Sequence, residues 1–273
     1  MRPSGIFAFI FTLLPVSAAQ AHEVWIEPLQ WSYAAGEDLQ AHLRNGEMFK
    51  GVDLAWNDRS TVLAEQRQGD DTAGLTGRLG DLPAISAQGV GDGLMTLIYQ
   101  SGYNTVTYRE FEKFSSFVAE KGYSDVVETH AARDLPRTQI KEAYVRFAKS
   151  LIPVGDGEGE DTARGLELEI VALDNPYTEE GSDLRFQVLY RDAPLVENRV
   201  TVFARDAAGL VTTRELETSA DGIVKVQTDP GATYLIDTVV VREPARSLVI
   251  ETKGAMWESL WASLTFQSPP AGQ

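Results

Sequence analysis

Three histidines, His22, His42 and His130, are the residues of this sequence best suited to bind a metal or to transfer protons near neutral pH. The chain has no cysteine, so thiolate metal sites and cysteine nucleophiles are excluded. The possible metal ligands are therefore histidine, carboxylate, methionine and a terminal amine. Any histidine-dependent chemistry must use one or more of these three residues.

His22 directly follows a segment with the layout of a secretory signal. Arg2 precedes an apolar run over residues 6–14, and Ala19 and Ala21 supply the small residues of a cleavage site. We expect cleavage after Ala21 and a periplasmic mature protein. His22 would then carry a free α-amine, whose reference pKa is about 8, and the amine and the imidazole could chelate one divalent metal together. The alternative is that the peptidase merely tolerates a histidine at this position.

A second nitrogen ligand should come from His42 or His130. Leu39, Ala41 and Leu43 alternate along a predicted strand, so His42 falls on its polar face, where it can neighbour the first strand. His130 lies on a predicted short helix that would have to fold against the same edge. For each of these two histidines the alternative is an ordinary packing or surface role. A carboxylate could complete the metal shell or orient a ring. The candidate metal ligands are His22, His42, His130, Glu23 and Glu47.

Composition and missing motifs exclude several function classes. Asp and Glu number 40 against 24 Lys and Arg, giving a net charge of −16, which argues against nucleic acid and anionic lipid as partners. The sequence lacks a nucleophile elbow, a Walker loop, a dinucleotide-binding fingerprint and a zinc-protease helix. We expect no enzymatic activity, and no membrane span after signal cleavage.

The hydrophobic pattern predicts a mainly β protein with one or two short helices in the middle. Short strands fill residues 22–98, and helical spacing predicts helices over residues 110–121 and 124–133. Residues 140–152 favour a strand, with a helix as the rival interpretation. Seven strands then follow at the spacing of an immunoglobulin-like or transthyretin-like sandwich. They are expected at residues 166–173, 184–190, 200–205, 211–217, 223–228, 234–241 and 259–266.

The acidic, glycine-rich residues 155–161 indicate a domain boundary. We expect two β-sandwich-like domains joined by a linker. The predicted parts are a signal peptide (1–21), an N-terminal β-rich domain with short helices (22–154), the acidic linker (155–164), a C-terminal β-sandwich domain (165–267) and a tail (268–273).

The mature chain resembles a bacterial family of periplasmic components of nickel or cobalt uptake systems. The likeness covers almost the whole mature chain, and its most specific parts are the histidine start and the tryptophan motif near the end. This chain departs from many relatives at Arg44-Asn45, where they carry a histidine. The segments that carry the likeness are His22-Glu23-Val24-Trp25-Ile26-Glu27-Pro28, Gly46-Glu47-Met48-Phe49, Tyr144-Val145-Arg146-Phe147-Ala148-Lys149-Ser150-Leu151, Asn175-Pro176-Tyr177 and Trp257-Glu258-Ser259-Leu260-Trp261-Ala262-Ser263-Leu264-Thr265-Phe266.

The resemblance implies an exported metal-handling protein that works beside an inner-membrane transporter or an outer-membrane receptor. Its ligand would be a divalent transition metal, nickel, cobalt or copper. Two alternatives stay open, a histidine-brace copper protein with redox activity and a non-catalytic β-sandwich adaptor of a transporter or receptor. Stoichiometric metal content would separate the adaptor from the other two.

Overall fold

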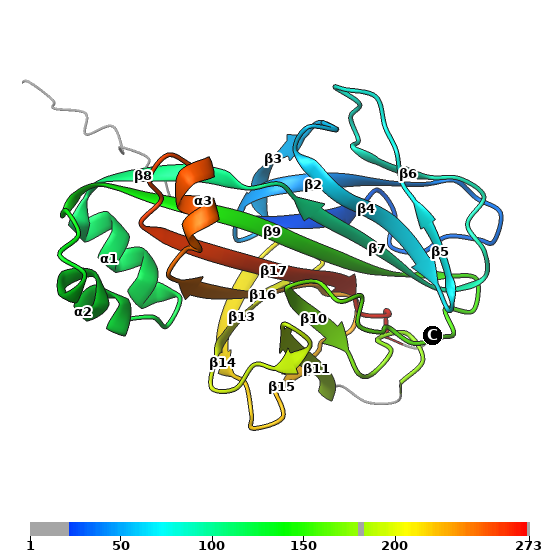
Figure 1. The fold of residues 1–273 in the computed structure, drawn as a ribbon. Coiled ribbons are helices and arrows are strands. Elements are labelled where there is room, and N and C mark those ends of the chain that lie inside the picture. The colour runs from blue at the N-terminus through cyan, green and yellow to red at the C-terminus, as the bar shows by residue number, and fades with distance from the viewer. Residues whose placement is uncertain (1–21, 180–182, 272–273) are drawn as a thin grey trace, which may run out of the picture.

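The computed structural model describes residues 22–179 and 183–271, so the expected signal peptide lies outside the described residues. Within these residues the largest sheet has nine strands, in the order β14-β13-β16-β17-β9-β7-β4-β5, with β8 also paired to β9 (Figure 1). Its strands are β4 (Thr61–Gln68), β5 (Asp71–Gly74), β7 (Gly93–Ser101), β8 (Asn104–Glu110), β9 (Thr138–Val154), β13 (Arg199–Arg205), β14 (Val211–Glu217), β16 (Thr233–Arg242) and β17 (Trp257–Gln267).

The centre of this sheet is the parallel pair β9 and β17. Their register sets Arg146 beside Trp261 and Ser150 beside Thr265. Nearly every residue of β17 is buried, as expected for a strand covered on both faces. Two of the segments that carry the family resemblance are therefore neighbouring strands at the middle of the molecule.

A smaller sheet covers each face of the central one, above and below it in Figure 1. The first contains β1 (Glu23–Pro28), β2 (Leu39–Glu47), β3 (Lys50–Leu54) and β6 (Ile85–Ala87). It packs Ile26 and Leu39 against Met95 and Ile152 of the central sheet. The second contains β10 (Leu168–Ala172), β11 (Asp183–Tyr190), β12 (Ala193–Pro194) and β15 (Ile223–Gln227).

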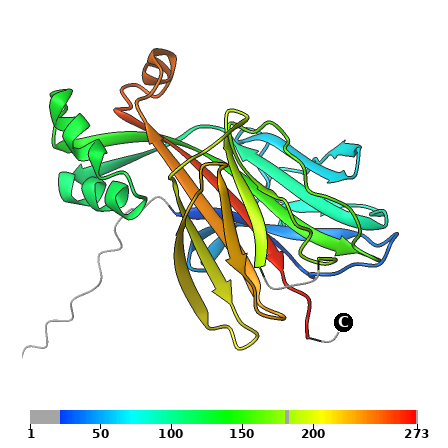
Figure 2. The same ribbon diagram turned by 90° about the horizontal axis from the view of Figure 1, so that it is seen from below.

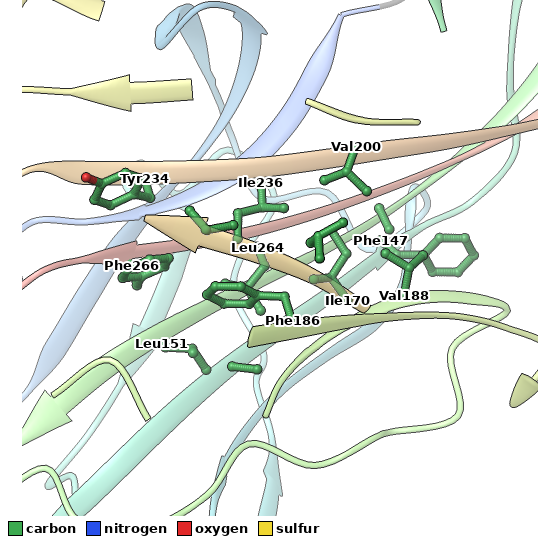
Figure 3. Close-up of a cluster of buried hydrophobic side chains, with 14 of the residues drawn as sticks. Phe147, Leu151, Ile170, Phe186, Val188, Val200, Tyr234, Ile236, Leu264 and Phe266 are labelled. Atoms are coloured by element: carbon green, nitrogen blue, oxygen red, sulfur yellow. The ribbon is translucent and has the colours of Figure 1, made fainter. Parts of the chain in front are cut away.

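The core between the second small sheet and the central sheet is the larger one. Phe186 stacks on Phe266, with ring centroids 5.5 Å apart, and Tyr234 also stacks on Phe266, at 5.1 Å. Figure 3 shows these rings among aliphatic side chains from both sheets. Burial of such side chains contributes about 1.5–3 kcal/mol each, so this layer holds the two halves of the chain together.

Short helices lie at one end of the long strands, away from the small sheets (Figure 2). They are α1 (Phe111–Glu120), α2 (Asp125–Ala132) and α3 (Arg246–Glu251). Phe114 of α1 stacks on Trp257, and Phe117 stacks on Trp261. No helix among the described residues is long and apolar enough to cross a membrane.

The mainly β fold predicted from the sequence is confirmed. Both predicted helices form, residues 140–152 lie in a strand, and all seven strands expected in the second half are present as β10, β11 and β13 to β17. Two sandwich-like packings also form, but they share the central sheet. β17, from the second predicted domain, pairs with β9, from the first. The expected boundary therefore does not separate two independent sheets.

Residues 155–164 are not an open linker. Asp161 is buried and accepts a hydrogen bond from Lys149 Nζ at 2.8 Å, and Glu169 lies 3.2 Å from the same nitrogen. The amide group of Asn175 donates to the carbonyl oxygens of Gly157 and Gly159, each at 2.9 Å. The acidic composition was misleading because one of its carboxylates pairs with a buried lysine of β9.

Candidate functional site

His22 directly precedes β1, the strand that is attached to the central pair β9 and β17. Ser263 Oγ donates to the Val24 carbonyl oxygen at 2.6 Å, and Thr265 Oγ1 donates to that of Ile26 at 2.6 Å. Both hydroxyl groups come from β17. These two bonds attach the first strand of the mature chain to the tryptophan motif and fix the position of His22.

Arg146 of β9 holds His22 itself. Its Nη1 donates a hydrogen bond to the His22 backbone carbonyl oxygen. The guanidinium carbon lies 4.7 Å from the centre of the Tyr144 ring and 4.8 Å from that of Trp261. Such cation–π contacts orient a buried arginine without neutralising it. Burial lowers the pKa of Arg146, although nearby acidic groups oppose this shift.

Glu23, the next residue, belongs to a buried ionic cluster. Lys121 Nζ, just after α1, lies 3.0 Å from Glu23 Oε1 and 3.4 Å from Asp237 Oδ2 of β16. Burial raises the pKa of Asp237, and the nearby charge of Lys121 limits this rise. Burial alone would lower the pKa of Lys121, but the two carboxylates outweigh it and raise that pKa. Glu23 therefore anchors β1 to the central sheet, and its ion pair competes with any metal.

Glu142 forms a second buried cluster nearby on β9. Tyr108 Oη donates to its Oε2 at 2.7 Å, and Ser259 Oγ donates to its Oε1. Trp261 Nε1 in turn donates to Ser259 Oγ at 2.9 Å. Burial raises the pKa of Glu142 to about 6, and the two hydroxyl donors limit the rise. This network supports Trp261, which contacts Arg146.

A tight hairpin between β2 and β3 brings Glu47 and Met48 beside His22. Met48 and Phe49 both have positive φ, 51° and 58°, as a two-residue hairpin turn requires. Phe49 is buried edge-on against Trp25, which compensates the backbone strain. A Cβ on Gly46 would lie 2.0 Å from the Lys50 carbonyl oxygen, so only glycine fits there.

His22 borders two cavities. The first, about 460 Å³, is shared with Glu47, Met48 and Lys50, and we call it the hairpin cavity. The second, about 440 Å³, lies between β1, β2 and β9, and we call it the His22 cavity. The His22 cavity is lined by His22, Asn45, Asn57, Tyr99, Tyr144 and Arg146, among others. The imidazole is thus partly buried but reachable from outside.

The other two histidines are not brought to His22, contrary to our expectation. His42 pairs with Glu27 across the β1–β2 ladder, five residues beyond His22, or about 17 Å along a strand. Its Nδ1 lies 3.3 Å from Asp53 Oδ2 on the opposite face of the sheet. His130 is 1% exposed, and both ring nitrogens are used, because Nδ1 accepts from Trp257 Nε1 at 3.0 Å and Nε2 donates to Pro136 O at 3.1 Å.

Side chains alone do not assemble a metal site in the part of the chain that the structure describes, since no three His, Asp or Glu residues gather there. A site at His22 therefore depends on the α-amine, which exists only after cleavage. The mature donor set would be this amine, the His22 imidazole and groups of the hairpin cavity, the Glu47 carboxylate and the Met48 thioether. Nitrogen, oxygen and sulfur donors of this kind fit a late transition metal.

Sequence reasoning missed Arg146 and Met48. Arg146 looked like a packing residue on an alternating strand, and only the pairing of β9 with β17 places it under His22. Met48 looked like an ordinary apolar residue. Its place in the Gly46-Glu47-Met48-Phe49 segment was the signal that could have indicated a role beside the terminus.

Comparison with known families assigns the chain to one of them. The family described as a domain of unknown function, DUF4198, matches residues 19–242. The chain belongs to the DUF4198 family. The DUF4198 match spans both sides of residues 155–164. No curated protein matches the chain.

Among solved structures, the chain is similar to a tetra-tandem repeat in the extending region of a large adhesion protein. The sequence identity is 14% and the TM-score is 0.21. The match covers 92% of this DUF4198 chain and 50% of the adhesion structure, so the chain spans about half the length of that structure.

Proposed function

We propose that this protein is a periplasmic metal-binding accessory of a transition-metal uptake system, of nickel or cobalt type, and that its cargo ion binds at the amino-terminus of the mature chain. One observation carries the proposal. His22, which cleavage would make terminal, is held by Arg146 at the edge of the hairpin cavity, where Glu47 and Met48 supply further donors. The resemblance to nickel and cobalt uptake components supports the choice of cargo.

This role needs binding and release but no catalysis. The α-amine and imidazole of His22 would bind the ion through two nitrogens, while Glu47 supplies a carboxylate oxygen that Ni²⁺ and Co²⁺ accept. Glu23 stays with Lys121 and holds the strand in place. A membrane transporter or receptor would receive the ion, since the hairpin cavity opens beside the terminus.

Substitution of single histidines tests the proposal. We expect His22→Ala to abolish binding of nickel by protein purified from the periplasm, as measured by calorimetry and metal content. His42→Ala is the matched control, because His42 faces Asp53 on the other side of the sheet, and it should bind nickel as the wild type does. Equal loss in both variants, or none in His22→Ala, would contradict the assignment.

Copper is a second candidate cargo because the Met48 thioether lines the hairpin cavity. Thioether sulfur is a soft ligand that favours Cu(I). Replacement of Met48 by Leu keeps the side-chain size and removes the soft donor, so it should weaken Cu(I) binding more strongly than nickel binding. Equal effects of this variant on Cu(I) and on nickel binding would argue against copper as the natural cargo.

A further inference from the structure

Arg146 is a buried cation that forms no ion pair with a carboxylate within residues 22–179 and 183–271. The residue is 5% exposed. The acidic residues around it bind other groups, Glu23 through Oε1 and Asp237 through Oδ2 to Lys121, and Glu142 to two hydroxyl groups. A buried charge without a partner is costly, so an anion from outside would stabilise it.

The charge of the His22 cavity, which Arg146 lines, differs from that of the chain as a whole. The net charge of the chain is −16, yet none of the described residues that line the cavity is Asp or Glu. Its polar groups are amides and hydroxyls, including Asn45 and Tyr144, whose side chains form no hydrogen bond within residues 22–179 and 183–271. The lining therefore favours a negatively charged ligand.

The size and the lining of the cavity fit a small molecule. A volume of about 440 Å³ lies in the range of ligand pockets, about 300–1,000 Å³. Trp56, Ile85 and Tyr99 supply apolar walls around the polar groups. Guanidinium groups match carboxylates especially well, because two parallel N–H donors can meet two oxygens.

We propose that the His22 cavity binds a small organic carboxylate through Arg146, and that the cargo metal arrives as the chelate of this acid. His22 borders the same cavity, so a carboxylate on Arg146 would lie beside the metal held by the mature terminus. The second half of this inference rests on the proposed function. The first half does not, because binding of the acid by Arg146 requires no metal.

The first experiment measures acid binding by metal-free, correctly processed protein. Citrate, a hydroxy acid, and L-histidine, an amino acid with an imidazole, are the probes, each titrated by calorimetry alone and as its nickel complex. We expect one site for at least one probe without metal. Absence of binding by both metal-free probes would overturn the inference.

Three variants locate the site. Arg146→Gln should weaken binding of the acid at least about tenfold, the loss expected for a buried charge-assisted pair. Arg205→Gln is the matched control, since Arg205 also contacts an aromatic ring, Phe49, but is paired with Glu27 outside this cavity. Asn45→Asp adds a carboxylate to the cavity wall at nearly constant volume and should weaken acid binding as well. If Arg146→Gln does not fold, Asn45→Asp decides the question.

The outcomes separate this inference from the proposed function. Unchanged acid affinity in a folded Arg146→Gln protein, or in Asn45→Asp where the first variant is unfolded, would overturn it. Loss of nickel binding in His22→Ala with acid binding retained would support both proposals. Acid binding by a wild type that never binds nickel would support the cavity site and refute only the metal role.

Discussion

The guanidinium of Arg146 donates a hydrogen bond to the backbone carbonyl oxygen of His22, although 124 positions separate the two residues in the chain. This contact places the expected mature terminus on the central strands, next to two cavities. A terminus held in this way can present an amine and an imidazole in a fixed geometry. Much of the site therefore depends on how firmly β1 is attached.

The hydroxyl groups of Ser263 and Thr265 provide that attachment. Ser263→Ala with Thr265→Val removes both side-chain bonds to β1 and should lower the free energy of unfolding by about 2 kcal/mol, at about 1 kcal/mol for each bond. The double substitution should accelerate amide hydrogen exchange more in β1 than in β16. Thr213→Val, on the exposed edge strand β14, is the control and should change stability by less than about 0.5 kcal/mol. Unchanged exchange in β1 would show that its ladder with β2 suffices.

Glu142 should make the protein less stable as pH rises. Its pKa is 4.5 as a reference and about 6 in the fold, so the folded state binds the proton more tightly. The stability due to protonated Glu142 is complete below the reference pKa and is lost as pH rises through about 6. With 1.36 kcal/mol for each pKa unit, the loss is about 2 kcal/mol.

Glu142→Gln should remove this part of the pH dependence. Urea unfolding at about pH 4 and about pH 8 would measure it. Burial also raises the pKa of Asp237. The free energy of unfolding of the variant should therefore still fall between these two pH values, but by less than that of the wild type. The control is Glu112→Gln on the exposed face of α1, which should keep the wild-type slope. The same slope in Glu142→Gln would contradict the role given to burial of this carboxyl group.

Asp161 is expected to be important for stability despite its place in an acidic loop. Asp161→Ala would leave Lys149 buried with one carboxylate fewer and should cost about 3–5 kcal/mol. Glu160→Ala, the exposed neighbour, should have almost no effect. Limited proteolysis should spare residues 155–164 in the wild type and cut there in Asp161→Ala. Early cleavage of the wild type at this loop would restore the linker interpretation.

Sequence patterns predicted where the helices and strands of this fold lie better than they predicted which strands pair. Phe111, Phe114 and Val118 recur at helical spacing, and α1 follows from that period alone. The pairing of β9 with β17 could not be inferred, because parallel strands distant in sequence leave no local signal of their partner. The Lys149–Asp161 pair was hidden for the same reason, so an acidic glycine-rich segment looked like a linker.

The structure brings some of the candidate residues together and keeps others apart. His22 and Glu47 do border one cavity, as the candidate list allowed, whereas His42 and His130 are directed to Asp53 and Trp257. Alternation along β2 correctly placed His42 on its polar face. Alternation along β2 could not show that His22 lies on the opposite face of the sheet from His42, because that depends on the register of β1 and β2.

The mature protein should begin at His22. Ala19 and Ala21 provide the small residues that signal peptidase requires, so intact mass of the exported protein should equal that of residues 22–273. A different first residue would remove the α-amine from the site, and the metal proposal would fail with it.

Nickel binding by two proteins that differ only at the amino-terminus shows whether the α-amine of His22 is a metal ligand. One is the correctly processed chain, and the other carries a single alanine ahead of His22, which keeps the imidazole but moves the amine away. We expect about one tightly bound nickel in the processed protein and none in the extended one, because the proposed site needs the amine as a ligand. Equal nickel content in the two proteins would contradict this expectation.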